Sequence, residues 1–282
     1  MQIEPIAGAL GADVTGVDVS IPLEDQLFND IKAALLEYGV LALRNQNLTP
    51  AQQLAFVSRF GKIHYHPHVK GLPEQPEVME ILKREEDVHN FGAGWHTDQM
   101  FTPAPANYTC LYARELPDTG GDTLYACMRN GYRTLSPAMQ KLAQTLKTEN
   151  RSFAAQLSGK NQTSAGYFGA GMRTKEAAAD EALVSHPVVR KHPETGDPVL
   201  YVGLHSIKLA GFTEEESKPL LEFWKKHLVV PENTCRLRWQ LGTLAIWDNR
   251  LVLHNAINDY PGKRRRMHRV TVSGEPTQSW RG

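Results

Sequence analysis

The segment LAIWDNRLVLHNAINDYPGKRRRMHRVTV, residues 244–272, contains two of the short apolar runs that decide the fold, Leu244 to Trp247 and Arg269 to Val272. Short runs of apolar or alternating residues are typical of buried β-strands. Similar runs occur earlier in the chain, at Val40 to Leu43, Tyr108 to Ala113, Thr123 to Cys127, Val199 to Val202 and Leu237 to Gln240. Turn signals that contain glycine separate these runs, for example at 118–121 and 194–197. The chain is therefore expected to be rich in strands.

Helical patterns are fewer. A segment from about Leu23 to Tyr38 carries apolar residues at helical spacing, and Gly39 ends it. Thr49 and Pro50 form the capped start of a helix that extends to Phe60. Two more helices are predicted at Pro137 to Leu146 and Thr213 to His227. Many strands with a few peripheral helices predict a mainly β fold, either a β-sandwich or a jelly roll, in one domain over residues 1–282.

Composition limits the class of protein. The 282 residues carry 31 basic and 31 acidic side chains, and this formal neutrality argues against a protein that coats nucleic acid or anionic lipid. No apolar run is long enough to span a bilayer, and the first residues lack the pattern of a signal peptide. Cys110, Cys127 and Cys235 are too scattered for a disulfide framework or a zinc knuckle. We expect a soluble protein of the reducing cytoplasm, with its thiols in the core.

The first stretch that carries chemistry is Gly94-Trp-His-Thr-Asp98. If this segment is a strand, residues two apart share a face, so His96 and Asp98 project side by side. One imidazole and one carboxylate placed in this way can both reach a single ion. A His-x-Asp pair is also common on an ordinary polar strand face, which is the competing interpretation.

A second stretch, Trp247-Asp-Asn-Arg250, follows a buried strand and is itself followed by His254. Loops that end buried strands often present functional groups, so His254 is a candidate third ligand. The alternative is a histidine that is hydrogen-bonded within the core. Two histidines and one carboxylate, here His96, Asp98 and His254, are the ligand set of non-haem Fe(II) sites.

The third stretch is the basic run Lys263-Arg-Arg-Arg-Met-His-Arg269, which leads into a predicted strand. Strand periodicity places Arg265 and Arg269 on one face. Two inward arginines without acidic neighbours in sequence are costly to bury unless they meet anionic ligands. A guanidinium pairs well with a carboxylate or a sulfonate. The alternative is a solvated basic face.

Together these features resemble the taurine/2,4-D (TauD/TfdA) dioxygenase family, and the resemblance covers nearly the whole chain. The spacing that carries it runs from His96-x-Asp98 through Thr123 and His254 to Arg265. Five ordered motifs support it: Leu10-Gly-Ala-Asp-Val-Thr-Gly-Val-Asp18, Trp95-His-Thr-Asp98, Gly120-Gly-Asp-Thr123, His186-Pro-Val-Val189 and Trp247-Asp-Asn-Arg250. Members of this family are Fe(II)- and 2-oxoglutarate-dependent oxygenases with a double-stranded β-helix (jelly-roll) core.

The resemblance implies a role for each matching residue. His96, Asp98 and His254 would be the catalytic metal ligands for Fe(II). Arg265 and the hydroxyl of Thr123 would hold the distal carboxylate of the co-substrate 2-oxoglutarate. With O2 as the second co-substrate, the reaction would hydroxylate a substrate and release succinate and CO2. Where the hydroxylated carbon carries a heteroatom, the product would then cleave.

For the substrate, the resemblance points to His66, which precedes Pro67, and to Arg269, four residues beyond Arg265. Both would meet an anionic group. Taurine-cleaving members carry a tyrosine where this chain has Val69, and they also differ at Leu204-His-Ser206 and at Phe91-Gly-Ala-Gly94. The expected substrate is therefore bulkier than taurine, for example a longer sulfonate, an alkyl sulfate or an aryloxyalkanoate.

Other classes of function remain as alternatives. A zinc hydrolase could use the same His/Asp/His ligands, and the alternating histidines His64, His66 and His68 could form a separate zinc site. A non-catalytic binding module or a nucleic-acid site at 263–269 is less favoured, because the three ligands are present and the chain is neutral. The family implies a homo-oligomer, either dimer or tetramer. Residues 154–182 have weak periodicity and are predicted to be a mobile insertion that acts as a lid.

Overall fold

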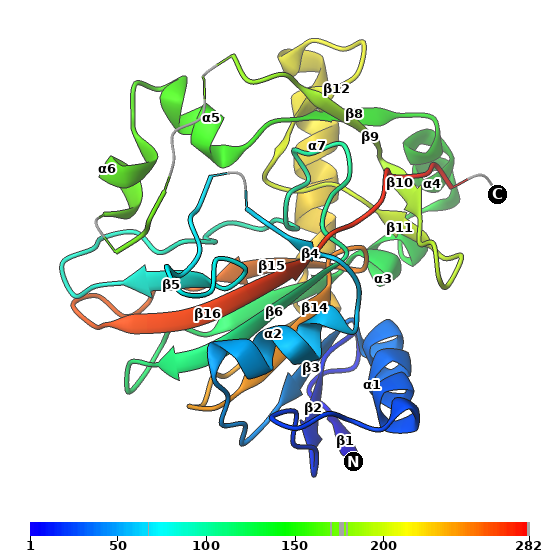
Figure 1. Cartoon of the computed structure of the whole chain (residues 1–282). Helices are drawn as coiled ribbons and strands as arrows, with labels where there is room; N and C mark the ends of the chain where they lie inside the picture. The colour runs from blue at the N-terminus through cyan, green and yellow to red at the C-terminus, as the bar shows by residue number, and fades with distance from the viewer. Residues whose placement is uncertain (67, 170, 175–177, 179, 281–282) are drawn as a thin grey trace.

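The computed structural model describes residues 1–282 except 67, 170, 175–177, 179 and 281–282 (Figure 1). The strands are β1 (Gln2–Pro5), β2 (Ala12–Thr15), β3 (Val40–Leu43), β4 (Ile63–His64), β5 (Met79–Lys83), β6 (Tyr108–Glu115), β7 (Thr123–Cys127), β8 (Lys147–Asn150), β9 (Val184–Pro187), β10 (Val189–Lys191), β11 (Pro198–Leu200), β12 (Ser206–Leu209), β13 (Thr234–Leu237), β14 (Leu244–Asp248), β15 (Val252–Ala256) and β16 (Arg265–Val272). The helices are α1 (Asp25–Tyr38), α2 (Pro50–Ser58), α3 (Met128–Arg133), α4 (Pro137–Gln144), α5 (Phe153–Ser158), α6 (Ser164–Phe168), α7 (Glu214–Leu228) and the short 3-10 helix η1 (Pro231–Asn233).

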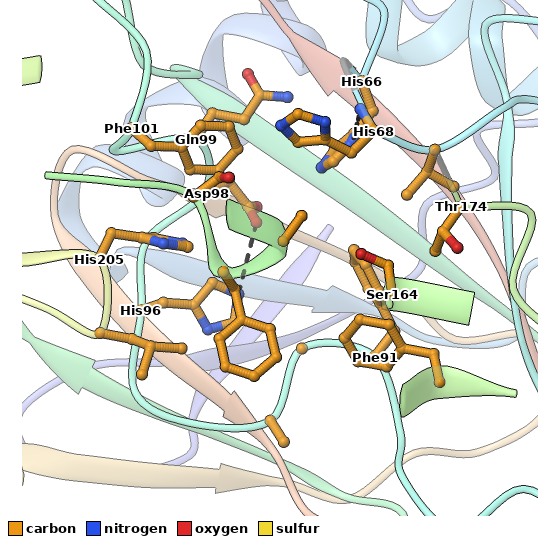
Figure 2. Close-up of a pocket in the computed structure, with 18 of the residues that line it drawn as sticks. His66, His68, Phe91, His96, Asp98, Gln99, Phe101, Ser164, Thr174 and His205 are labelled. Atoms are coloured by element: carbon orange, nitrogen blue, oxygen red, sulfur yellow. Dashed lines mark hydrogen bonds and ion pairs between the residues drawn. The ribbon is translucent and has the colours of Figure 1, made fainter. Parts of the chain in front are cut away.

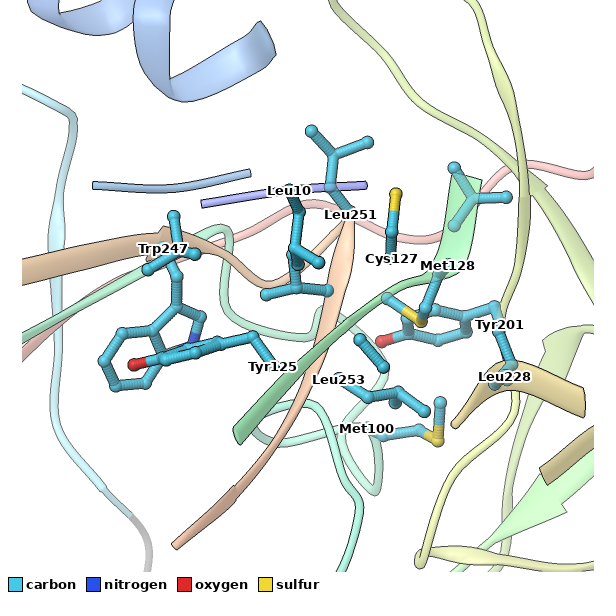
Figure 3. Packing of buried hydrophobic residues seen from close by; sticks show 14 of the residues in the cluster. Leu10, Met100, Tyr125, Cys127, Met128, Tyr201, Leu228, Trp247, Leu251 and Leu253 are labelled. Carbon is cyan, nitrogen blue, oxygen red and sulfur yellow. The ribbon is translucent and has the colours of Figure 1, made fainter. Parts of the chain in front are cut away.

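Two sheets face each other across the core. Within the described residues the larger sheet has the strand order β1-β2-β3-β14-β6-β16-β4, and β5 also pairs with β16. The smaller sheet that faces it has the order β13-β7-β15. Figure 3 shows the packing between them, where the ring of Tyr125 on β7 meets that of Trp247 on β14 at 5.6 Å between centroids. This two-sheet arrangement confirms the predicted mainly β jelly-roll core.

Strand β3 of the larger sheet is buried on both faces. Side chains alternate along a strand, so its residues pack in two directions. On β3, Val40 and Ala42 face the smaller sheet, whereas Leu41 and Leu43 pack beneath α1 and α2. Both helices form where their caps predict. Gly39 takes the left-handed conformation that ends α1.

The predicted elements are largely confirmed. Thr49 starts α2 with a capping box, although the helix ends at Ser58 instead of Phe60. The strand predicted at Leu237 to Gln240 was misplaced: the strand is Thr234–Leu237, whose four residues pair with β7, and the chain leaves the sheet after it. Strand β15, which carries His254, was missed, because its sequence continues a polar turn and shows little alternation.

Part of the predicted mobile insertion, residues 154–182, lies outside the described residues, and its mobility stays a prediction. Its described part includes α6 and most of α5.

Buried cysteines and helix lengths bear on the class of protein. All three cysteines are buried and free, as expected of small core residues. None of the described helices is long and apolar enough to cross a membrane.

Candidate active site

His96 and His254 are brought together by their own backbones. The His96 amide donates to the His254 carbonyl at 3.0 Å, and the His254 amide donates to the His96 carbonyl at 2.7 Å. This isolated antiparallel bridge joins the loop before β6 to β15. The two imidazole rings consequently lie close together, tilted by 47° with 4.1 Å between their centroids. The bridge therefore fixes two of the three predicted ligands side by side.

The local structure of the His96–Asp98 pair differs from the prediction. These residues were expected on one strand, but His96 is a single bridge residue and Asp98 begins a turn. The chain cannot stay extended here because Gly92, Gly94 and Gln99 have positive φ angles of 86°, 88° and 58°. The turn folds the Asp98 carboxylate back toward His96, so the two side chains still meet.

The three side chains form a compact cluster. Oδ1 of Asp98 lies 3.8 Å from Nε2 of His96 and 3.7 Å from Nε2 of His254. Figure 2 shows Asp98 above His96, joined by this contact. Among the described residues this is the one group of three or more potential ligands close enough to hold a metal ion. The alternative zinc site at His64, His66 and His68 does not form such a group.

The protonation states suit metal binding. Burial alone would raise the pKa of Asp98, but Arg269, His254 and His96 together hold it well below its usual range. Burial lowers the pKa of both His96 and His254, so both imidazoles are neutral at neutral pH. A carboxylate and two neutral imidazoles are the forms that ligate a metal.

Hydrogen bonding sets the tautomer of His96. Its Nδ1 lies 2.7 Å from the carbonyl oxygen of Gly94, which can only accept. The proton is therefore on Nδ1, and the lone pair of Nε2 faces Asp98. Nδ1 of His254 is buried and has no hydrogen-bond partner among the described residues. The arrangement matches a site of two histidines and one carboxylate that keeps other coordination positions open.

A narrow cavity beside this cluster contains Thr123 and Arg265, at the starts of β7 and β16. Arg265 is 4% exposed, and its Nε and Nη2 have no hydrogen-bond partner within the described part of the chain. The Thr123 hydroxyl accepts from the indole of Trp239 at 3.0 Å, which leaves its own proton free to donate. A buried guanidinium without partners is costly, so this cavity fits a carboxylate ligand.

A second cavity opens on the other side of the cluster (Figure 2). Arg269 lines both cavities, and its Nη2 lies 2.8 Å from Oδ1 of Asp98. His66 also lines the second cavity. Nδ1 of His66 accepts from the amide of His68 at 3.1 Å, so its Nε2–H is the donor. A cation and an N–H donor in one cavity suit an anionic group.

The remaining walls of this second cavity are mainly apolar, and sequence reasoning missed most of them. They come from loops and from α5 and α6: Val69, Phe91, Phe101, Phe153, Tyr167, Phe168 and Leu204. Isolated aromatics in segments without clear periodicity give no signal that they share a cavity. Polar side chains also line it, among them His68, Gln99, Thr174 and His205, and burial lowers the pKa of His205 to about 3.

Comparisons with known proteins agree with this geometry. The family model described as "Taurine catabolism dioxygenase TauD, TfdA family" matches residues 2–271. An alkylsulfatase of Acinetobacter baylyi is 31% identical over 100% of this chain and 88% of its own length. An (S)-phenoxypropionate/alpha-ketoglutarate-dioxygenase of Sphingobium herbicidovorans is 30% identical, with 98% of this chain and 96% of that protein covered. The crystal structure of AAD-2 in complex with Mn(II) and N-oxalylglycine has a TM-score of 0.82 at 26% identity, with 98% of this chain and 100% of that chain covered.

Proposed function

The chain belongs to the TauD/TfdA dioxygenase family and is an Fe(II)- and 2-oxoglutarate-dependent dioxygenase, and we propose that it hydroxylates a small anionic substrate with an apolar body at the His96–Asp98–His254 cluster. The observation that carries this proposal is the cluster itself. On one side of it lies a buried guanidinium with two nitrogens that find no hydrogen-bond partner among the described residues, and on the other a mainly apolar cavity. A zinc hydrolase with the same ligands would have no use for the Thr123–Arg265 cavity.

Each proposed role follows from the contacts of the side chain. His96, Asp98 and His254 hold Fe(II), which when bound supplies the O2 chemistry that couples decarboxylation of 2-oxoglutarate to hydroxylation. Arg265 and Thr123 hold the distal carboxylate of 2-oxoglutarate, and this orients the keto-acid end of the molecule toward the cluster. Succinate and CO2 are released with the hydroxylated product.

The substrate class rests on the second cavity. Arg269 and the Nε2–H of His66 bind the anionic group, and the aromatic walls exclude water from the organic part. Two relatives are named for alkyl sulfates and for phenoxypropionate, and each of these compounds combines an anionic group with an apolar body. We assign the substrate to the sulfonates, alkyl sulfates and aryloxyalkanoates. Where hydroxylation falls on a carbon that carries oxygen or sulfur, the product cleaves.

Binding of metal and co-substrate gives a direct test of the reaction class. Fe(II) and 2-oxoglutarate, added together without O2, are expected to produce a weak visible charge-transfer band, because the keto acid chelates the metal. Absorption spectroscopy of the folded, reduced protein measures it. Zn(II) added in place of Fe(II) is the control and gives no visible band. A colourless Fe(II) sample would contradict the oxygenase site.

The role of Arg269 is tested by comparing charged and neutral substrates. Arg269→Ala is expected to lower kcat/KM for an accepted anionic substrate by about 30-fold or more, because the loss of a buried charge partner costs about 2 kcal/mol or more. For the methyl ester of the same aryloxyalkanoate the loss should be much smaller. Substrate-dependent succinate formation measures both. Equal losses for the acid and the ester would remove Arg269 from the anion site.

Domain organisation, cellular location and oligomeric state complete the proposal. Residues 1–282 form one domain, since the larger sheet takes strands from β1 to β16. The protein acts in the cytoplasm, whose reducing conditions suit the three free thiols. It assembles as a dimer or tetramer, a state that sedimentation would measure.

A further inference from the structure

A chain of hydrogen bonds leads from the Trp247–Arg250 turn to the carboxylate of Asp98. The indole N–H of Trp247 donates to Oδ1 of Asn249 at 2.9 Å. The amide Nδ2 of Asn249 donates to the hydroxyl of Thr109, also at 2.9 Å. That hydroxyl donates to Oδ2 of Asp98 at 2.6 Å. None of the roles assigned above uses Asn249 or Thr109.

The direction of each hydrogen bond is fixed by chemistry. An indole N–H can only donate, so the atom of Asn249 that faces Trp247 must be its oxygen. The Nδ2 of Asn249 then faces Thr109 and must donate to it. Because Thr109 already accepts this bond, its single hydroxyl proton is left for the ionised Asp98. The chain therefore has one arrangement and ends on Oδ2 of the carboxylate.

This chain of hydrogen bonds is buried, and it is supported by the paired strands β6 and β14. Thr109 is 0% and Asn249 is 1% exposed, so water does not compete for these bonds. Thr109 lies on β6 directly opposite Trp247 of β14. The backbone of Asn249 is held from two sides, since its amide donates to Asn107 at 2.9 Å and its carbonyl accepts from the Thr97 hydroxyl at 2.6 Å.

We propose that Thr109 and Asn249 are positioning residues that hold the Asp98 carboxylate so that Oδ1 alone is presented to the metal. This inference rests on the proposed function, because it takes Asp98 as a ligand. With Oδ2 engaged by Thr109, Oδ1 is the oxygen that lies 3.8 and 3.7 Å from the two imidazole Nε2 atoms. Without the hydroxyl, the carboxylate can rotate about its Cβ–Cγ bond. Arg269, whose Nη2 lies 2.8 Å from Oδ1, then competes with the metal for the carboxylate oxygens.

Metal affinity is the quantity that tests this role without turnover. Loss of a hydrogen bond to a ligating carboxylate typically costs about 10- to 100-fold in metal affinity. Thr109→Val keeps the shape of the side chain and removes the hydroxyl, so it is expected to raise the Kd for Mn(II) by about that factor. Thr109→Ser keeps the hydroxyl and should restore the Kd to within about threefold of the wild type. The free Mn(II) signal in electron paramagnetic resonance gives the Kd of the full-length protein.

A matched control separates positioning from general loss of a buried hydroxyl. Thr148 is also 0% exposed, and its hydroxyl donates to the carbonyl of His186 at 3.4 Å. Thr148→Val should therefore leave the Mn(II) Kd unchanged. Asn249→Ala should also raise the Kd. Its Oδ1 accepts from the backbone amide of Asp98 at 3.3 Å as well, so only part of its effect passes through Thr109. The two substitutions together should therefore raise the Kd by less than the product of their separate effects. Asn249→Ala also decides the question if Thr109→Val does not fold.

Two results would overturn this positioning role. The first is a wild-type Mn(II) Kd in Thr109→Val, or in Asn249→Ala if Thr109→Val does not fold. The second is fully additive effects of the two substitutions on the Kd. Failure of the proposed metal site gives a different result. In that case the wild type binds no Mn(II), or His96→Ala binds it equally well.

Discussion

His96→Ala is expected to abolish succinate formation, with a loss of roughly a thousandfold or more. The substitution removes the Nε2 atom that lies 3.8 Å from Asp98 and leaves two of the three clustered ligands. Its backbone bridge to His254 does not need the side chain, so the fold should persist. Succinate production with saturating Fe(II) and 2-oxoglutarate measures the effect, and thermal unfolding confirms that the protein is folded.

A control for this substitution is His227→Ala. His227 lies on α7, where Nε2 contacts the Thr134 hydroxyl and the Gly131 carbonyl. This variant should keep the activity of the wild type, because the side chain contacts none of the clustered residues in the described structure. Retained turnover in His96→Ala would show that His96 is not a ligand of the reacting metal.

The second large effect concerns the co-substrate. Arg265→Ala is expected to raise the KM for 2-oxoglutarate by roughly 30-fold to several thousandfold, because losing the partner of a buried charge costs about 2–5 kcal/mol. Two nitrogens of the guanidinium have no hydrogen-bond partner in the part of the chain that the structure describes, and Arg265 lines the same narrow cavity as Thr123. The KM for 2-oxoglutarate should change far more than the KM for the organic substrate, since Arg269 remains.

The neighbouring residue supplies the matched control. Arg264 directly precedes β16, and it pairs with Glu115 at 3.3 Å and Glu85 at 3.9 Å. Arg264→Ala removes the same charge next door in sequence and should leave the KM for 2-oxoglutarate within about twofold, as surface pairs contribute little. If both variants shift that KM equally, Arg265 acts only through overall charge.

Much of the fold could be predicted because its signals are local. The capping box at Thr49, the left-handed Gly39 and the continuous apolar run of the strand Val40–Leu43 each involve neighbours in sequence. The strand around His254 gave no such signal. Its partners are the smaller sheet and the His96 loop, contacts that form only in the folded chain.

The candidate site divides in the same way. Spacing and residue type identified His96, Asp98 and His254, which the structure brings together, but for a different reason than the one predicted. The prediction placed His96 and Asp98 on one face of a strand, whereas a turn at Asp98 and the backbone bridge between His96 and His254 bring the three side chains together. Asn249 belongs to the Trp247–Arg250 motif, but its role and that of Thr109 could not be inferred from sequence. A buried threonine or asparagine can be interpreted only once its hydrogen-bond partner is known.

Arg265 and Arg269 lie on one face of β16, four residues apart on a strand paired on both sides. Their Cα atoms are therefore about 13 Å apart, and that spacing cannot change without breaking the sheet. If the two arginines anchor the keto acid and the substrate as proposed, the strand fixes the distance between their two negative charges. New substrate preferences would then arise from changes in the residues that line the second cavity, while this distance stays the same. The same fold could in this way accept diverse substrates.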